Sequence, residues 1–68
     1  MSSSPEKLVH MANQIGKFFQ SQGPDRAVSG TAEHIRKFWD PHMRRKFLDL
    51  ADHAELHPLV RKAVPLIS

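Results

Sequence analysis

The chain has 68 residues, a formal net charge of +3 with neutral histidines, and no cysteine, which excludes disulfides and cysteine-bound zinc or iron–sulfur centres. This length suits one small domain, whose core stabilises the fold by only roughly 3–5 kcal/mol unless a metal or a partner chain contributes. No apolar run approaches the roughly 18–20 residues that span a bilayer, and the opening residues MSSSPEK lack a signal-peptide pattern, so we expect a soluble, cytoplasmic protein without membrane contact.

Prolines mark four predicted helix starts. A proline suits the first turn of a helix, where its missing N–H is not needed, and each of these prolines precedes an apolar stretch: Pro5, Pro24, Pro41 and Pro58. The first helix is expected from about Pro5 to Ser21, ahead of Gly23-Pro24. Its apolar residues follow the 3.6-residue period of one helix face that would be buried: Leu8, Met11, Ala12, Ile15, Phe18 and Phe19.

The second helix is expected from about Pro24 to Trp39. The residues assigned to its buried face are Val28, Ala32, Ile35 and either Phe38 or Trp39. Gly30 costs this helix about 1 kcal/mol relative to alanine. A close helix crossing would account for that glycine, because Ala27 and Thr31 lie beside it on adjacent turns.

Asp40-Pro41 ends the second helix and starts a third, with Asp40 as its N-cap. The third helix should run from Pro41 to Ala51 or Ala54, and its expected buried residues are Met43, Phe47, Leu50 and, in the longer version, Ala54. Arg44 is placed to pair with Asp40 four residues earlier.

A short fourth helix should run from Pro58 to about Val64, where Pro65 ends it. Residues 65–68 would then be a tail, and residues 1–4 a flexible N-terminus. No segment alternates with period two over a useful length. The prediction is therefore an all-α fold: residues 1–68 as one small bundle of three main helices plus a short C-terminal helix.

The sequence contains no recognisable catalytic constellation. His53 and His57 are four residues apart, but His57 precedes Pro58 and is pushed out of helical geometry, so the pair should not form one face for zinc. No serine lies in a G-x-S-x-G elbow, and no glycine-rich phosphate loop is present. We expect no catalytic, metal or cofactor site on this chain.

Two pairs of adjacent aromatics, Phe18-Phe19 and Phe38-Trp39, are the strongest functional signal. Neighbours on a helix point about 100° apart, so a small core buries one ring of each pair well and the other only at its edge. One interpretation is a wide apolar face within a tight bundle, and the other is a surface patch for a partner. Tryptophan and arginine together are typical of interface hot spots.

Three segments of the sequence resemble one known family. MANQIGKFF, AVSGTAEHIRKFWDPHMRRKFLDLA and LHPLVRKAV are similar in order and spacing to the small delta subunit of soluble NAD-dependent formate dehydrogenases. The resemblance extends from about Lys7 to Val64, and its most specific part runs from His34 to Arg44.

The resemblance implies a non-catalytic chain in a multi-subunit enzyme that oxidises formate to carbon dioxide and reduces NAD⁺. The alpha subunit of such a complex carries a bis-molybdopterin guanine dinucleotide site with molybdenum or tungsten, together with iron–sulfur clusters, and flavin and NAD sites lie on another subunit. The delta chain binds no cofactor, and it is expected to associate with the alpha subunit and to support assembly, cofactor insertion or stability.

The resembling segment and the aromatic signal together give a predicted partner-binding set: Arg36, Phe38, Trp39, Asp40, Pro41 and Arg44. Trp39 would be an apolar anchor, Asp40 a cap that fixes the angle between two helices, and Arg44 a donor to Asp40 or across the interface. Two alternatives stay open. One is a small basic nucleic-acid-binding protein, which the cations between Arg36 and Lys46 suggest, and the other is a homo-oligomer whose apolar patch a second copy covers.

Overall fold

The computed structural model describes residues 4–67. These residues form four α-helices and one 3₁₀ turn: α1 (Pro5–Phe19), η1 (Gln20–Gln22), α2 (Pro24–Phe38), α3 (Pro41–Ala51) and α4 (Pro58–Ile67). No strand occurs in this part of the chain, so the all-α prediction is confirmed. Of the predicted flexible N-terminus, residues 1–3 lie outside the described range, and Ser4 caps α1 by accepting a hydrogen bond from the Lys7 backbone N–H at 3.3 Å.

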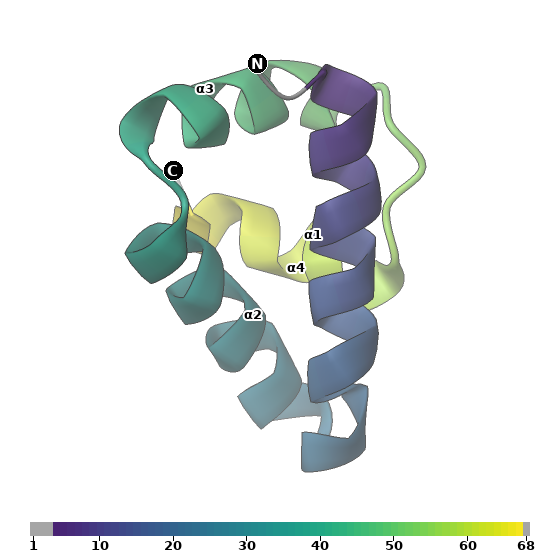
Figure 1. Cartoon of the computed structure of the whole chain (residues 1–68). Coiled ribbons are helices and arrows are strands. Elements are labelled where there is room, and N and C mark those ends of the chain that lie inside the picture. Colours follow the sequence, from purple (N-terminus) through teal and green to yellow (C-terminus); the bar gives the residue numbers. More distant parts are fainter. Residues whose placement is uncertain (1–3, 68) are drawn as a thin grey trace.

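Helices α1 and α2 form a V that is joined at its point by η1 and Gly23 (Figure 1). Gly23 has a φ of 94°, the only positive φ within residues 4–67, and this conformation suits glycine because it has no Cβ. Helix α3 crosses the open end of the V. Helix α4 packs behind the V, mostly against α2 (Figure 1). The front of the V is left without a covering helix.

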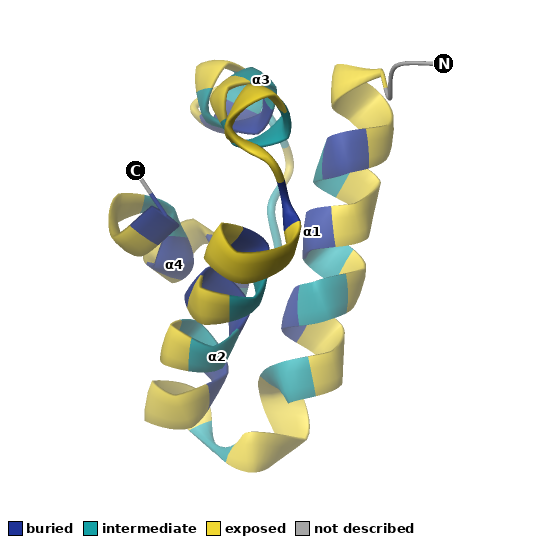
Figure 2. Cartoon of the chain, turned by 60° about the vertical axis from the view of Figure 1, so that its left-hand side comes forward, coloured by how far each residue is buried: buried dark blue, intermediate teal, exposed yellow. Residues whose placement is uncertain are grey.

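The core lies where the inner faces of the four helices meet (Figure 2). Its buried hydrophobic residues are Leu8, Ala12, Ala27, Ala32, Ile35, Trp39, Phe47, Ala51, Val60, Ala63 and Ile67. Five of these eleven are alanines, which let the helices approach one another closely. The predictions for Ala32, Ile35 and Phe47 are confirmed, whereas Leu50 and Ala54 are only half-buried.

Two close contacts explain the glycines within helices. A Cβ on Gly16 would lie 2.6 Å from Cγ2 of Val60, so this glycine permits the approach of α4 to α1. A Cβ on Gly30 would lie 2.8 Å from Cδ1 of Phe19. The close neighbour of Gly30 is therefore a ring from α1 that lies over α2, rather than the crossing helix backbone that the sequence suggested.

Side-chain hydrogen bonds fix the connection between α3 and α4. The Asn13 amide on α1 donates to the Glu55 carbonyl at 3.0 Å and accepts from the His57 backbone N–H at 2.8 Å. The Arg61 guanidinium on α4 donates to the carbonyls of Ala51 and Ala54, both at 2.8 Å. The Arg61 bond to Ala51 satisfies a carbonyl in the last turn of α3, and the other bonds hold the segment that follows it.

The predicted end of the fourth helix is wrong, because α4 continues through Pro65 to Ile67. A proline inside a helix removes one backbone hydrogen bond and normally ends or kinks the helix. Here the next turn places Ile67 in the core, and this burial favours continuing the helix. The tail predicted for residues 65–68 is therefore helical as far as Ile67, and Ser68 lies outside the described range.

Candidate partner-binding surface

The front of the V carries an exposed apolar face. Helix α1 has two apolar stripes: Leu8, Ala12 and Gly16 point into the core, and Met11, Ile15 and Phe18 lie beside them on the next stripe. Met11 is 39% exposed and Phe18 is 70% exposed. The prediction that both belong to the buried face is therefore wrong, because α2, α3 and α4 cover only one side of α1 and leave the second stripe open.

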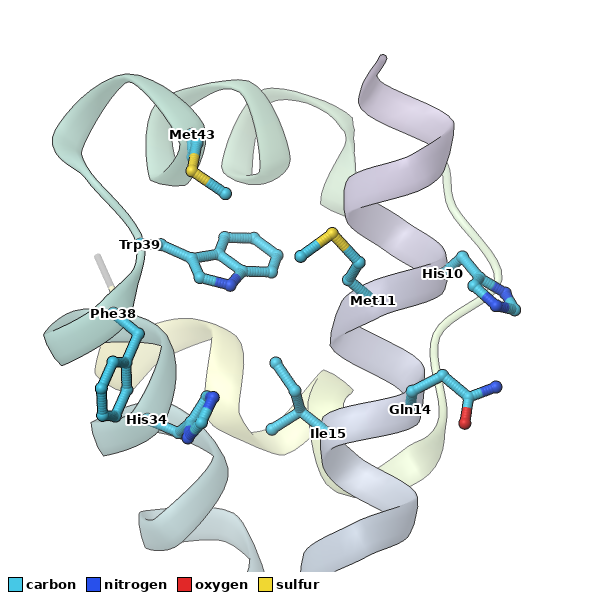
Figure 3. A pocket seen from close by; sticks show the side chains of 8 residues that line it. All are labelled: His10, Met11, Gln14, Ile15, His34, Phe38, Trp39 and Met43. Carbon is cyan, nitrogen blue, oxygen red and sulfur yellow. The ribbon is translucent and has the colours of Figure 1, made fainter. Parts of the chain in front are cut away.

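A groove of about 470 Å³ lies at the wide end of this face, where α1, α2 and α3 meet. Figure 3 shows Met11, Ile15, Trp39 and Met43 pointing into the space between the helices, while His10 and Gln14 extend from the outer side of α1. The residues that line it are His10, Met11, Gln14, Ile15, His34, Phe38, Trp39 and Met43. Apart from two imidazoles, one amide and the indole N–H, these side chains are apolar.

Trp39 forms the inner wall of the groove and is only 5% exposed. Helix α2 ends at Phe38, and Trp39 has extended backbone angles (φ −91°, ψ 136°), which turn its side chain away from the direction of Phe38. Its indole meets the Phe47 ring edge to face at a centroid distance of 5.6 Å. Trp39 is therefore a core residue with one edge on the groove, and this position does not suit the free apolar anchor that the sequence suggested.

Phe38 is the outward member of its pair, with 71% of its surface exposed. The Phe38 ring lies against the His34 imidazole at a centroid distance of 4.6 Å. His34 in turn lies 6.2 Å from Phe19, which meets Phe18 edge to face at 5.2 Å. This row of rings crosses from α2 to α1 and extends the apolar face beyond the groove. Of the two interpretations that the sequence left open, the exposure of Phe18 and Phe38 favours a surface patch over a wide buried face.

The groove lining offers hydrogen-bond donors and contains no carboxylate. Among residues 4–67, the indole Nε1–H of Trp39 forms no hydrogen bond, and Figure 3 shows this nitrogen on the side of the ring toward His34 and Ile15. The nearest acid in an adjoining hollow is Glu33, whose Oε1 pairs with Nζ of Lys37 at 3.7 Å on the exposed surface. The surface is thus apolar with donors along it.

The six residues predicted to bind a partner do not gather on one face. Phe38 and the edge of Trp39 lie on the groove, and Arg36, Asp40 and Pro41 are exposed on α2 and at the α2–α3 junction. Arg44 is half-buried and borders a separate hollow of about 380 Å³ with Arg45, Leu48, Asp49 and Ile67. A role in partner binding stays a prediction for this set.

The capping role predicted for Asp40 is confirmed, since its Oδ1 accepts a hydrogen bond from the Met43 backbone N–H at 2.8 Å. The predicted Arg44–Asp40 ion pair is wrong: the described side chains show no such pair, and Nε of Arg44 is buried without a hydrogen-bond partner. Asp40 directs its carboxylate to the backbone of α3, while Arg44 faces the hollow beside α4.

Sequence reasoning missed several residues of the groove: His10, Met11, Ile15, His34 and Met43. The width of the apolar face on the first helix could have indicated the α1 residues among them. Leu8, Ala12 and Phe19 follow one line along a helix, and Met11, Ile15 and Phe18 follow a second, so the stripe was wide enough for two contact surfaces.

Metal-ligating side chains do not cluster in the described chain. No three His, Cys, Asp or Glu residues within 4–67 are placed to hold one ion. His57 instead caps α4, because its Nδ1 accepts from the Leu59 backbone N–H at 3.2 Å. No helix in residues 4–67 has the length and apolar character to cross a bilayer.

Comparison with protein families gives one match. The family model described as the NADH-dependent formate dehydrogenase delta subunit FdsD matches residues 7–64, which include the whole apolar face described above. Comparisons with curated proteins and with solved structures give no match.

Proposed function

This chain belongs to the FdsD family of NADH-dependent formate dehydrogenase delta subunits, and on that premise we propose that it is a non-catalytic accessory subunit that docks on the catalytic alpha subunit of the complex. The observation that carries the docking role is the exposed apolar face on α1 and α2. Phe18 and Phe38 are each about seven-tenths exposed, although a chain of this size has few large apolar side chains to spare. Large exposed apolar patches mark interaction surfaces.

In this proposal the redox chemistry belongs to the other subunits. They would hold the bis-molybdopterin guanine dinucleotide with molybdenum or tungsten, the iron–sulfur clusters and the flavin, and they would pass electrons from formate to NAD⁺. The residues of this chain agree with such a division, because it has no cysteine to ligate an iron–sulfur cluster. Its contribution would be to support assembly, cofactor insertion or stability of the catalytic subunit.

Co-expression tests the proposal directly. The affinity-tagged chain is produced together with the other subunits of its formate dehydrogenase, and the eluate is analysed for subunit content, metal content and formate-dependent NADH formation. We expect the catalytic subunit to co-elute with the tagged chain, and the isolated chain to reduce no NAD⁺ with formate. Omitting the chain should lower the yield or the metal content of the complex. Elution of the tagged chain alone, or formate oxidation by the isolated chain, would contradict the proposal.

A further inference from the structure

We propose that the groove between α1 and α2, closed at one end by α3, receives an amphipathic helix of the catalytic subunit, with an apolar stripe of about two turns flanked by carboxylates. This inference rests on the proposed function and specifies both the surface used for docking and the chemistry of its occupant.

The length and shape of the apolar face fit a helix. Met11 and Phe18, the ends of this stripe, are seven residues apart on α1, which is about 10 Å at 1.5 Å per residue. His34 and Phe38 form the opposite wall along one turn of α2 (Figure 3). A helix laid between two such walls places its i, i+3, i+4 and i+7 side chains in the groove. It would complete on the front of the V the packing that α4 provides behind it.

The inner wall of the groove points to an acceptor on the occupant. Trp39 is only 5% exposed. Its indole Nε1–H is directed to the groove and has no hydrogen-bond partner in the described chain. This N–H is not among the buried polar atoms that lack a partner in the described chain, so water can reach it. Covering the groove would remove that water, and a buried indole N–H usually finds a partner. A carboxylate or carbonyl of the occupant would satisfy this donor.

Charge favours an acidic occupant over a second copy of this chain. The groove lining contains His10, Gln14 and His34 and no carboxylate, and the one acid of the adjoining hollow is already paired with Lys37. The whole chain carries a formal net charge of +3. Two copies would each carry this net positive charge, and neither would supply a carboxylate to the groove of the other, whereas an acidic partner would complement the net charge of the chain.

The first experiment uses a matched pair of exposed apolar residues. Phe38→Ala removes a ring of the face, and Leu66→Ala removes a side chain that is 49% exposed on α4. Both changes are at surface positions, so circular dichroism should show unchanged folding. We expect Phe38→Ala to weaken binding of the chain to the catalytic subunit about tenfold or more, as loss of an interface anchor does, and Leu66→Ala to leave it unchanged. Equal binding by wild type and Phe38→Ala would overturn the assigned surface.

The second experiment tests the sign of the occupant's charge. Gln14 is exposed on the groove, so Gln14→Glu and Gln14→Lys change charge with little change in size. If the occupant presents carboxylates to this position, Gln14→Glu should weaken binding several-fold and Gln14→Lys should preserve or strengthen it. The difference in affinity between the two variants should shrink at high salt. Tighter binding by Gln14→Glu than by Gln14→Lys would overturn the acidic occupant.

Zero-length carbodiimide coupling of the wild-type complex identifies the occupant, because it joins a lysine amine to a carboxylate in contact with it. Lys37 borders the hollow next to the groove. Besides the intrachain link between Lys37 and Glu33, we expect an interchain cross-link from Lys37 to an Asp or Glu beside an apolar helix of the catalytic subunit. A cross-link to a second copy of this chain as its main product would overturn the inference.

If the wild-type chain co-elutes with the catalytic subunit while Phe38→Ala and Gln14→Glu do so equally well, the docking surface is wrong and the proposed function still holds. If the wild-type chain fails to co-elute, the proposed function itself is wrong.

Discussion

Asp40 shows how one exposed side chain sets the geometry around it. The residue before a proline favours extended backbone, and Asp40 has φ −73° and ψ 166°. Its carboxylate then accepts from the Met43 N–H, which starts α3 at a fixed angle to α2. Trp39, one residue earlier, is drawn into the core by the same turn while Phe38 stays outside. The separation of the two rings is therefore a property of the helix break.

Replacing Asp40 should destabilise the fold measurably. Asp40→Ala removes the cap of α3 and should cost about 1 kcal/mol of the free energy of unfolding. Urea unfolding followed by the fluorescence of Trp39, the only tryptophan of the chain, would measure this change. Asp40→Asn is the control, because asparagine caps about as well as aspartate. An unchanged midpoint for Asp40→Ala would show that the cap contributes nothing in solution.

For the helices, the sequence predicted where each one starts better than it predicted which neighbours pack against it. Four prolines and the cap at Asp40 are local signals, and every helix start that they predicted is confirmed. The outward position of Phe18 depends instead on where α2 and α4 pack, and the sequence of α1 does not indicate which of its faces they cover. The predicted end of α4 was wrong for the same reason. The burial of Ile67 is a tertiary effect, and it outweighs the tendency of Pro65 to end the helix.

The candidate surface was predicted in part. Of the two interpretations of the adjacent aromatics, the exposure of Phe18 and Phe38 favours the surface patch. The angle between neighbouring helical residues accounts for this on α1, whereas the helix break accounts for it at Phe38 and Trp39. The sequence could not show that Trp39 is the inner ring, because α2 ends before it. It also could not show that Arg44 and Phe38 lie on different faces, since that requires the angle between α2 and α3.

The contact of α1 with α4 can be tested at Gly16. Alanine there would place its Cβ 2.6 Å from Cγ2 of Val60, a fully buried side chain with little room to move. Overpacking costs about 1–3 kcal/mol, against about 1 kcal/mol gained in helix propensity, so Gly16→Ala should destabilise the fold by about 1 kcal/mol. Thermal unfolding monitored by circular dichroism would measure the change.

A double-mutant cycle provides the control for this contact. In a Val60→Ala background the methyl group that Gly16→Ala meets is absent, so the same substitution should become neutral or stabilising. An identical effect of Gly16→Ala in both backgrounds would show that the two residues are not coupled, and that the close approach of α4 to α1 does not limit the size of residue 16.

For the whole molecule, the core and the exposed face have one cause. Alanines in the core bring α2 and α4 close together, which leaves little internal volume for large rings. Such a chain gains stability from whatever covers its open face, because a partner that binds only the folded state shifts the folding equilibrium toward it. The small core and the surface proposed for docking are thus two aspects of the same packing.

The distribution of cations argues against nucleic acid as that partner. A helix–turn–helix reader would present α3 to the major groove, but α3 begins at the exposed carboxylate of Asp40, where phosphates would approach. Lys37 is paired with Glu33, and Arg44 is half-buried, which leaves few free cations near this junction.

We therefore expect weak retention of the isolated chain on immobilised duplex DNA at physiological salt. A log–log plot of affinity against salt has a slope of about −0.9 for each phosphate neutralised, so a chain without a DNA site should give a slope that corresponds to only one or two contacts. Arg36→Ala and Arg45→Ala, which remove exposed cations on either side of the junction, should change this slope little. Tight retention with a steep slope that falls in both variants would instead favour the nucleic-acid-binding alternative, since only a cation in contact with phosphate contributes to the slope.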